Sequence, residues 1–251
     1  MTALPDLSVQ LYSVREPLAA DFSGTLGRLA EIGLTRVEPF QLLANAENLA
    51  SGLPEHGLTA PTTHQSLDGG DLDAIFHAAA ELGVGTVIHP FTAAEFWQTK
   101  QDVQRIADML AAAAGIAAGC GVRVAYHNHD WELSTIIDGR TALEVLAEHL
   151  DPTVVLQLDT YWAGVGGQDV PALLGRLGEK VVALHLKDGP LNGVTAEQLP
   201  LGQGALPAQE IVAAATALEF PVLEFDQYAG DIFDGIAASY AYATGTLGAS
   251  R

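Results

Sequence analysis

The sequence predicts a (β/α)₈ barrel, a TIM barrel, with residues 1–251 forming one domain. A unit recurs along the chain: an amphipathic helix, a Gly or Pro near its end, and a short β-branched strand. The 251 residues match the usual size of one barrel domain. No glycine-rich nucleotide-binding motif is present, which favours a closed barrel over an open doubly wound sheet.

Each predicted strand ends on a polar residue. The first strand lies near Ser8–Leu11, and later ones follow a helix-ending Gly or a Pro, as Gly33, Gly121 and Pro221 illustrate. In a barrel, functional groups lie at the carboxyl ends of the strands. These ends are Gln10, Glu38, His64, His89, His127, Asp159, His185 and Glu224.

Helices are expected between these strands. Alternating strands and helices imply parallel pairing through right-handed crossovers. The helical patterns cover roughly residues 22–33, 44–56, 71–83, 101–120, 140–150, 169–178, 207–219 and 231–246.

Charge and cysteine content restrict the partners and the compartment. The formal charge is -20, from 31 acidic and 11 basic residues, which disfavours nucleic acid and anionic membranes. Cys120 is the only cysteine, and Met1–Leu11 lacks the features of a signal peptide, so a cytoplasmic protein is expected. The apolar stretch Met109–Gly121 is too short to span a bilayer and is expected to be the buried side of a helix.

Strand alternation predicts a metal site. Leu156, Leu158, Leu184 and Leu186 share one parity, whereas Asp159, His185 and Glu224 occupy the other. If the apolar parity faces the helices, the polar parity faces the barrel axis. Carboxylates and imidazoles packed together there need compensation, which a divalent cation with mixed nitrogen and oxygen ligands provides.

Lys187 and several aromatic residues add to this predicted site. Lys187 shares the parity of His185, where it can donate to a substrate oxygen or form a salt bridge with Asp188 or another acid. Trp131 and Trp162 lie just beyond strand ends and are expected to wall a substrate pocket. Lys187 and Arg15 are the few cations near the strand ends, which favours a neutral sugar, keto-sugar or cyclitol over a phosphorylated substrate.

Five motifs together resemble the xylose isomerase-like barrel superfamily, which contains sugar isomerases, epimerases and dehydratases. The resemblance extends over essentially the whole chain. Its motifs are Ser8-Val-Gln-Leu-Tyr-Ser13, Tyr126-His-Asn-His-Asp-Trp-Glu132, Leu158-Asp-Thr-Tyr-Trp162, His185-Leu-Lys-Asp188 and Leu223-Glu-Phe-Asp226.

The resemblance implies four metal ligands, from strands five to eight. They fall at His127, Asp159, His185 and Glu224, for Mn²⁺, Mg²⁺, Co²⁺ or Zn²⁺. Many relatives have Glu on strand five, so either His127 replaces that carboxylate or Glu132 reaches in from the loop. Trp162 stands where endonuclease IV and several epimerases have a His, and this change, together with the acidic charge, speaks against a three-metal nuclease.

Further roles are also carried over from the resemblance. Similar epimerases exchange a proton between two glutamates, but here only Glu224 matches. His129, on the parity of His127, is therefore the candidate for the second acid or base, with Glu132 as a further catalytic candidate. Glu38 and His64 end the strands where relatives contact sugar hydroxyls.

The predicted function is a divalent-metal-dependent isomerase or epimerase that acts on a sugar or keto-sugar by proton transfer. One alternative is a metal-dependent lyase, a dehydratase or a glycoside-eliminating enzyme, acting on a keto-sugar or cyclitol. A second alternative is a non-catalytic sugar-binding barrel. The expected partner is a small carbohydrate, and the sequence leaves a homo-oligomer open.

Overall fold

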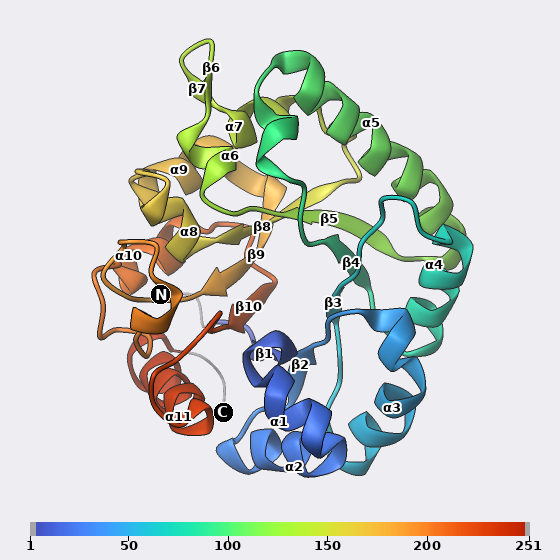
Figure 1. Cartoon of the computed structure of the whole chain (residues 1–251), viewed down its shortest axis with the longest axis vertical. Coiled ribbons are helices and arrows are strands. Elements are labelled where there is room, and N and C mark those ends of the chain that lie inside the picture. The colour runs from blue at the N-terminus through green and yellow to red at the C-terminus, as the bar shows by residue number, and fades with distance from the viewer. Residues whose placement is uncertain (1–3, 249–251) are drawn as a thin grey trace.

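The computed structural model describes residues 4–248 and confirms the barrel (Figure 1). Its main sheet has eight strands in the order β2-β1-β10-β9-β8-β5-β4-β3, each parallel to its hydrogen-bonded neighbours. The strands are β1 (Ser8–Gln10), β2 (Arg36–Glu38), β3 (Thr62–His64), β4 (Thr86–His89), β5 (Arg123–His127), β8 (Val155–Asp159), β9 (Val181–Leu186) and β10 (Phe220–Leu223).

Main-chain contacts between β2 and β3 bring the two ends of this strand order together. His64 N donates to Pro39 O at 2.8 Å, and Val37 N donates to Thr59 O at 2.9 Å. Bridges pair Arg36 with Thr59 and Phe40 with His64. The sheet therefore curls into a nearly closed barrel whose carboxyl strand ends form one mouth.

A ring of helices surrounds the strands, as Figure 1 shows. Their ranges agree with the sequence prediction except that the helix expected at 207–219 ends at Ala214, because Ala215 leaves the helical conformation (φ -82°, ψ 77°). The helices are α2 (Phe22–Ile32), α3 (Leu42–Glu55), α4 (Leu72–Glu81), α5 (Lys100–Ala117), α7 (Ala142–His149), α9 (Val170–Leu177), α10 (Ala208–Ala214) and α11 (Ile232–Tyr242).

Short elements that the sequence pattern did not reveal lie mainly in the loops after the strands. The loop after β5 holds α6 and a small hairpin, which projects at the upper left of Figure 1. Loops at this end of a barrel carry substrate-binding groups. The elements are η1 (Leu11–Val14), α1 (Arg15–Ala20), η2 (Ala94–Trp97), α6 (Trp131–Ser134), β6 (Ile136–Ile137), β7 (Arg140–Thr141), α8 (Thr160–Val165) and η5 (Thr195–Glu197).

The segment Lys100–Cys120 is long and apolar enough, by length and composition, to cross a membrane. It comprises α5 and a short 3₁₀ turn, and it packs on β5 between α4 and α7. Its buried residues recur at spacings of three and four from Val103 to Ala117. That spacing is typical of an amphipathic helix lying against a core, which accounts for its apolar composition.

The two parities of the strands have different surroundings. Leu156, Leu158 and Leu184 belong to the hydrophobic core shared with the helices. The opposite parity places polar side chains inside the barrel, where Gln10, Glu38 and further polar groups are buried and hydrogen-bonded to one another. The interior near the mouth is therefore a polar network, and it positions the candidate site.

Candidate active site

Asp159, His185 and Glu224 converge inside the mouth. One ligand atom from each lies within 4.8 Å of those of the other two, and all three residues are buried. The parallel register pairs Asp159 with His185 across β8 and β9, and Glu224 directly follows β10. The three groups that the sequence predicted as ligands thus lie close enough to share one ion.

The Asp159 carboxylate has one oxygen in use and one without a hydrogen bond. Oδ1 accepts from Trp162 N at 2.9 Å and caps α8. Oδ2 is buried and accepts no hydrogen bond, although Lys187 Nζ lies 2.8 Å away. Burial raises the pKa of Asp159 to about 6, which shows that nearby cations compensate its charge incompletely. Oδ2 is therefore the oxygen of Asp159 that faces a cation, which in this structure is the Lys187 ammonium group.

His185 contacts a carboxylate with each ring nitrogen. Nδ1 lies 2.5 Å from Glu224 Oε2, and Nε2 lies 2.6 Å from Glu38 Oε1. Burial lowers the pKa of His185, but these two carboxylates raise it to about 10. The metal-free ring is therefore protonated at both nitrogens, and Nδ1 would lose its proton to bind an ion beside Glu224.

Glu38 lies behind His185 and away from the surface. Its Oε2 accepts from Thr62 Oγ1 at 2.5 Å and from Gln157 Nε2 at 2.8 Å, and its Oε1 accepts from Gln10 Nε2 at 2.9 Å. Burial raises the pKa of Glu38, but the neighbouring His64 and His185 and the hydrogen bonds from His185 and Thr62 bring it down to about 2. With no exposed surface, Glu38 is better placed to orient His185 than to make the predicted sugar contact.

Gln157 determines which nitrogen of His127 faces Asp159. The Gln157 amide nitrogen donates to Glu38, so its oxygen Oε1 faces His127 Nδ1 at 2.9 Å. Nδ1 must then carry the hydrogen, which leaves the lone pair on Nε2. That atom lies 3.8 Å from Asp159 Oδ2, and burial lowers the pKa of His127 well below its ordinary value. His127 is a neutral imidazole aimed at the cluster.

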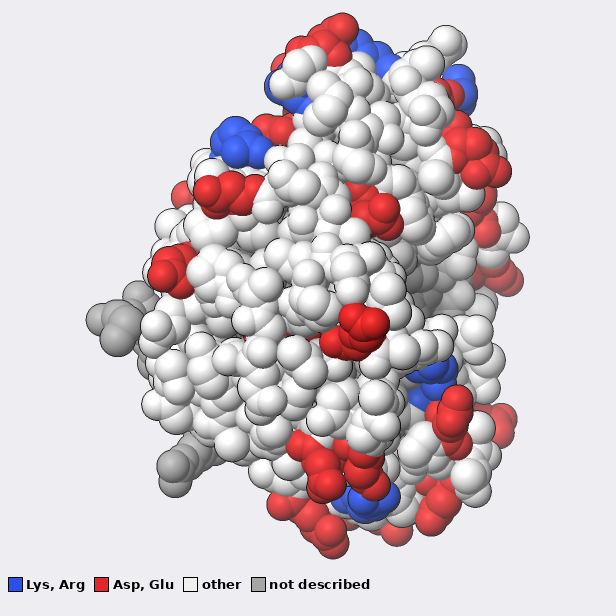
Figure 2. Space-filling model, turned by 60° about the vertical axis from the view of Figure 1, so that its left-hand side comes forward, with Lys and Arg blue, Asp and Glu red and all other residues white. Residues whose placement is uncertain are grey.

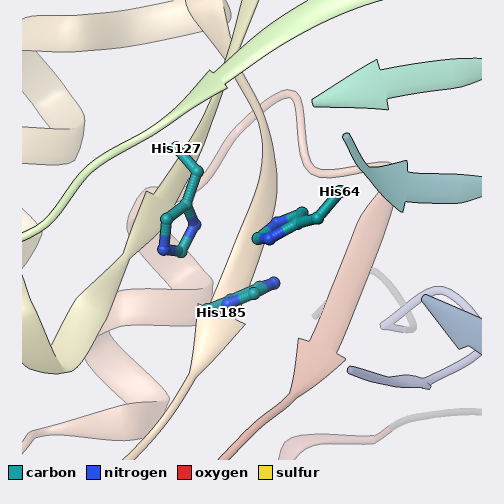
Figure 3. A group of neighbouring side chains, drawn as sticks. All are labelled: His64, His127 and His185. Atoms are coloured by element: carbon teal, nitrogen blue, oxygen red, sulfur yellow. The ribbon is translucent and has the colours of Figure 1, made fainter. Parts of the chain in front are cut away.

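His64 forms a second group of close side chains with His127 and His185 (Figure 3). The His64 and His185 rings are nearly parallel, 10° apart, with centroids 5.1 Å apart. Because imidazole lone pairs lie in the ring plane, an ion between these faces would meet no lone pair. His64 Nε2 also lies 2.7 Å from Gln157 Oε1. Through this contact and its approach to Glu38, with Nε2 3.3 Å from Oε1, His64 joins the supporting network, while 10% of its side chain stays exposed.

Glu132, the alternative fourth ligand, stabilises the loop after β5 through hydrogen bonds. Its Oε1 accepts from Tyr126 Oη at 2.7 Å, and its Oε2 accepts from His129 N at 2.9 Å. Burial raises the pKa of Glu132 to about 8. Both oxygens serve the loop, whereas His127 approaches Asp159, so the geometry favours His127 as the strand-five ligand.

His129 is the more accessible histidine of this loop. Its ring stacks on Trp131 with centroids 4.5 Å apart, and its side chain is 23% exposed. Nδ1 is buried without a hydrogen-bond partner, and burial lowers the pKa of His129 to about 3. Trp131 donates from Nε1 to Thr92 O at 3.1 Å, and Trp162 is half-buried. The His129–Trp131 pair therefore forms a partly open wall at the mouth.

Lys187 pairs with three carboxylates, none of which is the neighbouring Asp188. Its Nζ lies 2.8 Å from Asp159 Oδ2, 2.6 Å from Glu224 Oε2 and 3.1 Å from Asp226. Burial lowers the pKa of Lys187, but these carboxylates raise it well above the ordinary value. The sequence left open whether Lys187 donates to a substrate oxygen or forms a salt bridge with an acid. In the structure, Lys187 forms salt bridges.

Several of these polar residues were absent from the sequence prediction. Gln157 interrupts an otherwise apolar strand two residues before Asp159, and Asp226 follows Glu224 at the same spacing, so alternation was the available signal. Asp188 faces the other way and accepts hydrogen bonds from the backbone nitrogens of Gly189, Gly202, Gly204 and Leu206. It organises the loop after β9.

The donor set fits a divalent cation. Four carboxylates and two cationic side chains give the cluster a formal charge of -2, and all but the half-buried Asp226 are buried; they are Glu38, Asp159, Glu224 and Asp226 with His185 and Lys187. Asp159 Oδ2 lacks a hydrogen bond and His127 presents a free lone pair. Oxygen and imidazole ligands in this combination suit Mn²⁺, Co²⁺ or Zn²⁺. Acidic groups also outnumber basic ones on the face in Figure 2.

Fold and site together define a barrel with an acidic, histidine-containing mouth. Residues 26–224 match the xylose isomerase-like TIM barrel family, and the chain belongs to that family.

Individual relatives differ in their activities. A sugar phosphate isomerase/epimerase from Parabacteroides distasonis superposes with a TM-score of 0.83 at 20% identity, over 98% of this chain and 95% of that one. The IolI protein with a bound zinc atom gives a TM-score of 0.73 at 16% identity, over 96% and 97%. An inosose dehydratase from Geobacillus kaustophilus is 30% identical over 126 residues, which span 49% of this chain and only 40% of that protein.

Proposed function

We propose that this protein is a divalent-metal-dependent isomerase or epimerase that moves a proton next to the carbonyl group of a sugar or keto-sugar. The observation that carries the proposal is the convergence of Asp159, His185 and Glu224 within 4.8 Å inside the barrel mouth. His127 would complete the ligand set through Nε2. The IolI protein, which has the same fold and a bound zinc atom, supports a divalent metal in this protein.

A metal held by these residues would act as a Lewis acid toward a substrate oxygen. Side chains of the protein would remove the proton from the substrate and return it. Glu224 is the candidate base, since His185 and Lys187 keep it ionised by holding its pKa below the ordinary range, against the effect of burial. His129 is the candidate second acid or base because its side chain is partly exposed at the mouth.

The cations of the mouth favour a neutral substrate. Within residues 4–248, Lys187 is enclosed by carboxylates, and Arg15 donates from NH1 to the main-chain oxygens of Tyr12 and Asp226. A phosphate group is best held by several cations, and of these two only Arg15 has no carboxylate partner among residues 4–248. We therefore propose an unphosphorylated small carbohydrate as the substrate, and a cytoplasmic location in keeping with the lone Cys120.

A lyase is the second candidate, and a specific observation favours it. Similar epimerases use two glutamates to exchange the proton. Here strand five carries His127, and both oxygens of Glu132 are hydrogen-bonded within the loop, so Glu224 is the one glutamate of such a pair that could act as a base. A dehydratase needs one base to take the proton from carbon, a role that Glu224 or the neutral imidazole of His129 would meet. The similarity to an inosose dehydratase supports this candidate.

The test begins with metal analysis. Wild type is expected to carry or take up one divalent ion per chain, Asp159→Ala and Glu224→Ala to lose it, and the exposed-site control Glu210→Ala to keep it. If wild type binds no ion, or the two site variants bind Mn²⁺ as wild type does, the metal site is refuted.

The reaction is then followed in D₂O with keto-sugars and cyclitols. Deuterium in a product that retains all its hydroxyl groups indicates isomerase or epimerase chemistry. Loss of water or of an aglycone indicates the lyase. A metal-loaded protein that binds sugars and turns over none of them is a binding barrel, contrary to both proposals.

A further inference from the structure

The Lys187 ammonium group occupies the centre of the carboxylate cluster. Its side chain is 2% exposed, and Nζ lies within 3.1 Å of oxygen atoms from Asp159, Glu224 and Asp226. Asp159 and Glu224 are proposed metal ligands, whereas Asp226 is outside that group. Lys187 thus links the ligand cluster to one carboxylate beside it.

Lys187 and a metal would need the same atom of Asp159. Oδ1 of this residue is bonded to Trp162 N as the cap of α8, which leaves Oδ2 as the free ligand atom. Lys187 Nζ lies 2.8 Å from Oδ2. A divalent ion and an ammonium group placed against one oxygen would repel each other in a site with little water to screen them.

We propose that Lys187 is a built-in counter-ion that competes with the divalent metal for Asp159 and Glu224, and that Asp226 retains the ammonium group once the metal has bound. This inference rests on the proposed metal site. It makes Lys187 a positioning residue whose charge sets the metal affinity of the protein.

Asp226 is held in place independently of the ion site. Gln198 Nε2 donates to Asp226 Oδ2 at 2.7 Å, and Asp226 N donates to Gln198 Oε1 at 2.8 Å. Arg15 NH1 donates to the main-chain oxygen of Asp226 at 3.0 Å. A carboxylate fixed in this way, with both oxygens 3.1 Å from Nζ, can keep Lys187 paired without Asp159 and Glu224.

The competition predicts two effects of opposite sign. Without a metal, Lys187 offsets carboxylates that would otherwise be buried and mutually repulsive, so its removal should destabilise the metal-free protein. With a metal, the same removal frees both ligands and should strengthen binding. If Lys187 had a purely structural role, its removal would lower both the stability of the metal-free protein and the metal affinity. If it contacted only substrate, its removal would change neither.

The first experiment compares Lys187→Met with wild type, using Mn²⁺ as the probe. Because a hydrogen bond to a charged group is a strong interaction, the Mn²⁺ dissociation constant should fall about tenfold or more. The urea midpoint of the metal-free protein should fall as well. Lys187→Arg keeps the charge and should bind Mn²⁺ like wild type, as should Lys180→Met, whose lysine donates to Asp151 O at the opposite end of β9.

The second experiment introduces Asp226→Asn into the wild-type protein and into the Lys187→Met variant. With Lys187 present, the ammonium group loses its alternative partner, and Mn²⁺ binding should weaken about tenfold. With Lys187→Met, the same change should have no effect. Equal weakening in both backgrounds would mean that Asp226 is itself a ligand, which overturns the proposal.

The outcomes separate this inference from the proposed function. If wild type binds no Mn²⁺, the metal site itself fails. If wild type binds Mn²⁺ and a folded Lys187→Met protein binds it no more tightly, the metal site stands and the competition is refuted. Should Lys187→Met not fold, Lys187→Gln removes the charge while keeping a hydrogen-bond donor and serves for the same comparison.

Discussion

Gln157 Oε1 lies 2.9 Å from His127 Nδ1, and this contact directs the other nitrogen of His127 toward Asp159. A histidine bound to a metal needs a partner on its second nitrogen, which sets the tautomer and the ring orientation. The Gln157 amide provides that partner for His127, and Glu38 provides it for His185.

Gln157→Leu should therefore weaken metal binding. Without the amide oxygen, His127 is free to move its hydrogen to Nε2 or to rotate its ring. Loss of such a supporting contact typically costs about 10-fold to 100-fold in metal affinity. Titration with Mn²⁺ or Zn²⁺ against a chelator measures the change.

Gln168→Leu is the control for this variant. Gln168 is a half-buried amide whose two hydrogen bonds join Leu133 O and Arg176, whereas the fully buried Gln157 contacts His64, His127 and Glu38. Its loss should leave metal affinity within about twofold of wild type, as expected for a surface substitution. If the two variants bind metal equally well, Gln157 does not set the orientation of His127.

Asp188 should be important for stability and for the loop after β9. Its carboxylate accepts four backbone hydrogen bonds at 2.9–3.1 Å across residues 189–206. Asp188→Ala leaves these donors without their acceptor, and we expect a loss of about 3 kcal/mol or more in the free energy of unfolding. Urea denaturation gives the size, and proteolysis should begin within the loop.

Asp169→Ala provides the comparison for Asp188. Asp169 caps α9 and accepts one backbone hydrogen bond, from Ala172 N at 3.1 Å. Loss of such a cap costs about 1 kcal/mol. An Asp188→Ala protein no less stable than Asp169→Ala would show that the loop holds its shape without this carboxylate.

Glu132 should make the stability of the metal-free protein depend on pH. Burial raises the pKa of Glu132 to about 8, from 4.5 in the unfolded chain. The folded state therefore holds this proton more tightly, so its stabilising effect is complete below about pH 4.5 and is lost as the pH rises to about 8. Denaturation with urea between pH 5 and 8 follows the decline.

Glu132→Gln removes this titration but keeps a neutral side chain of the same shape. The wild-type free energy of unfolding should fall more steeply with pH than that of the variant, by roughly 1 kcal/mol per pH unit. The slope is the readout, because exchanging one of the two acceptor oxygens for an amide NH2 lowers the stability of the variant equally at every pH. Parallel slopes would show that Glu132 is ionised throughout this range.

Strand positions could be predicted from the sequence because each strand is short and flanked by turn-forming residues. Gly33 and Gly121 illustrate this, since both adopt positive φ angles where a helix ends before a strand. The length of α10 was overestimated, because its apolar pattern continues beyond Ala214 while the backbone turns toward β10. Pattern alone does not reveal such an ending.

The candidate site was predictable only in part, for a physical reason. Parity identifies which side chains face the axis, and this sufficed for Asp159, His185 and Glu224. It does not say how far a side chain reaches or which partner it prefers. Glu38 therefore ranked as a sugar contact although Thr62 and Gln157 bind it inside the barrel, and the position of Lys187 among three acids required the structure.

His127→Glu should change which metal the protein prefers. Imidazole nitrogen favours Zn²⁺ and Co²⁺, whereas a carboxylate favours the harder ions Mg²⁺ and Mn²⁺. The variant restores the residue type that many relatives have on strand five. It should bind Zn²⁺ less well relative to Mn²⁺, with the ratio of the two dissociation constants shifting about tenfold or more.

His64→Gln tests whether this shift depends on direct coordination. His64 is also buried and also contacts Gln157, but its Nε2 faces Gln157 Oε1 and Glu38 Oε1 instead of Asp159. A change at His64 should therefore leave the Zn²⁺ to Mn²⁺ ratio unchanged even if both affinities fall. If His127→Glu also leaves the ratio unchanged, His127 does not contact the ion, and the fourth ligand must come from elsewhere in the loop that holds Glu132.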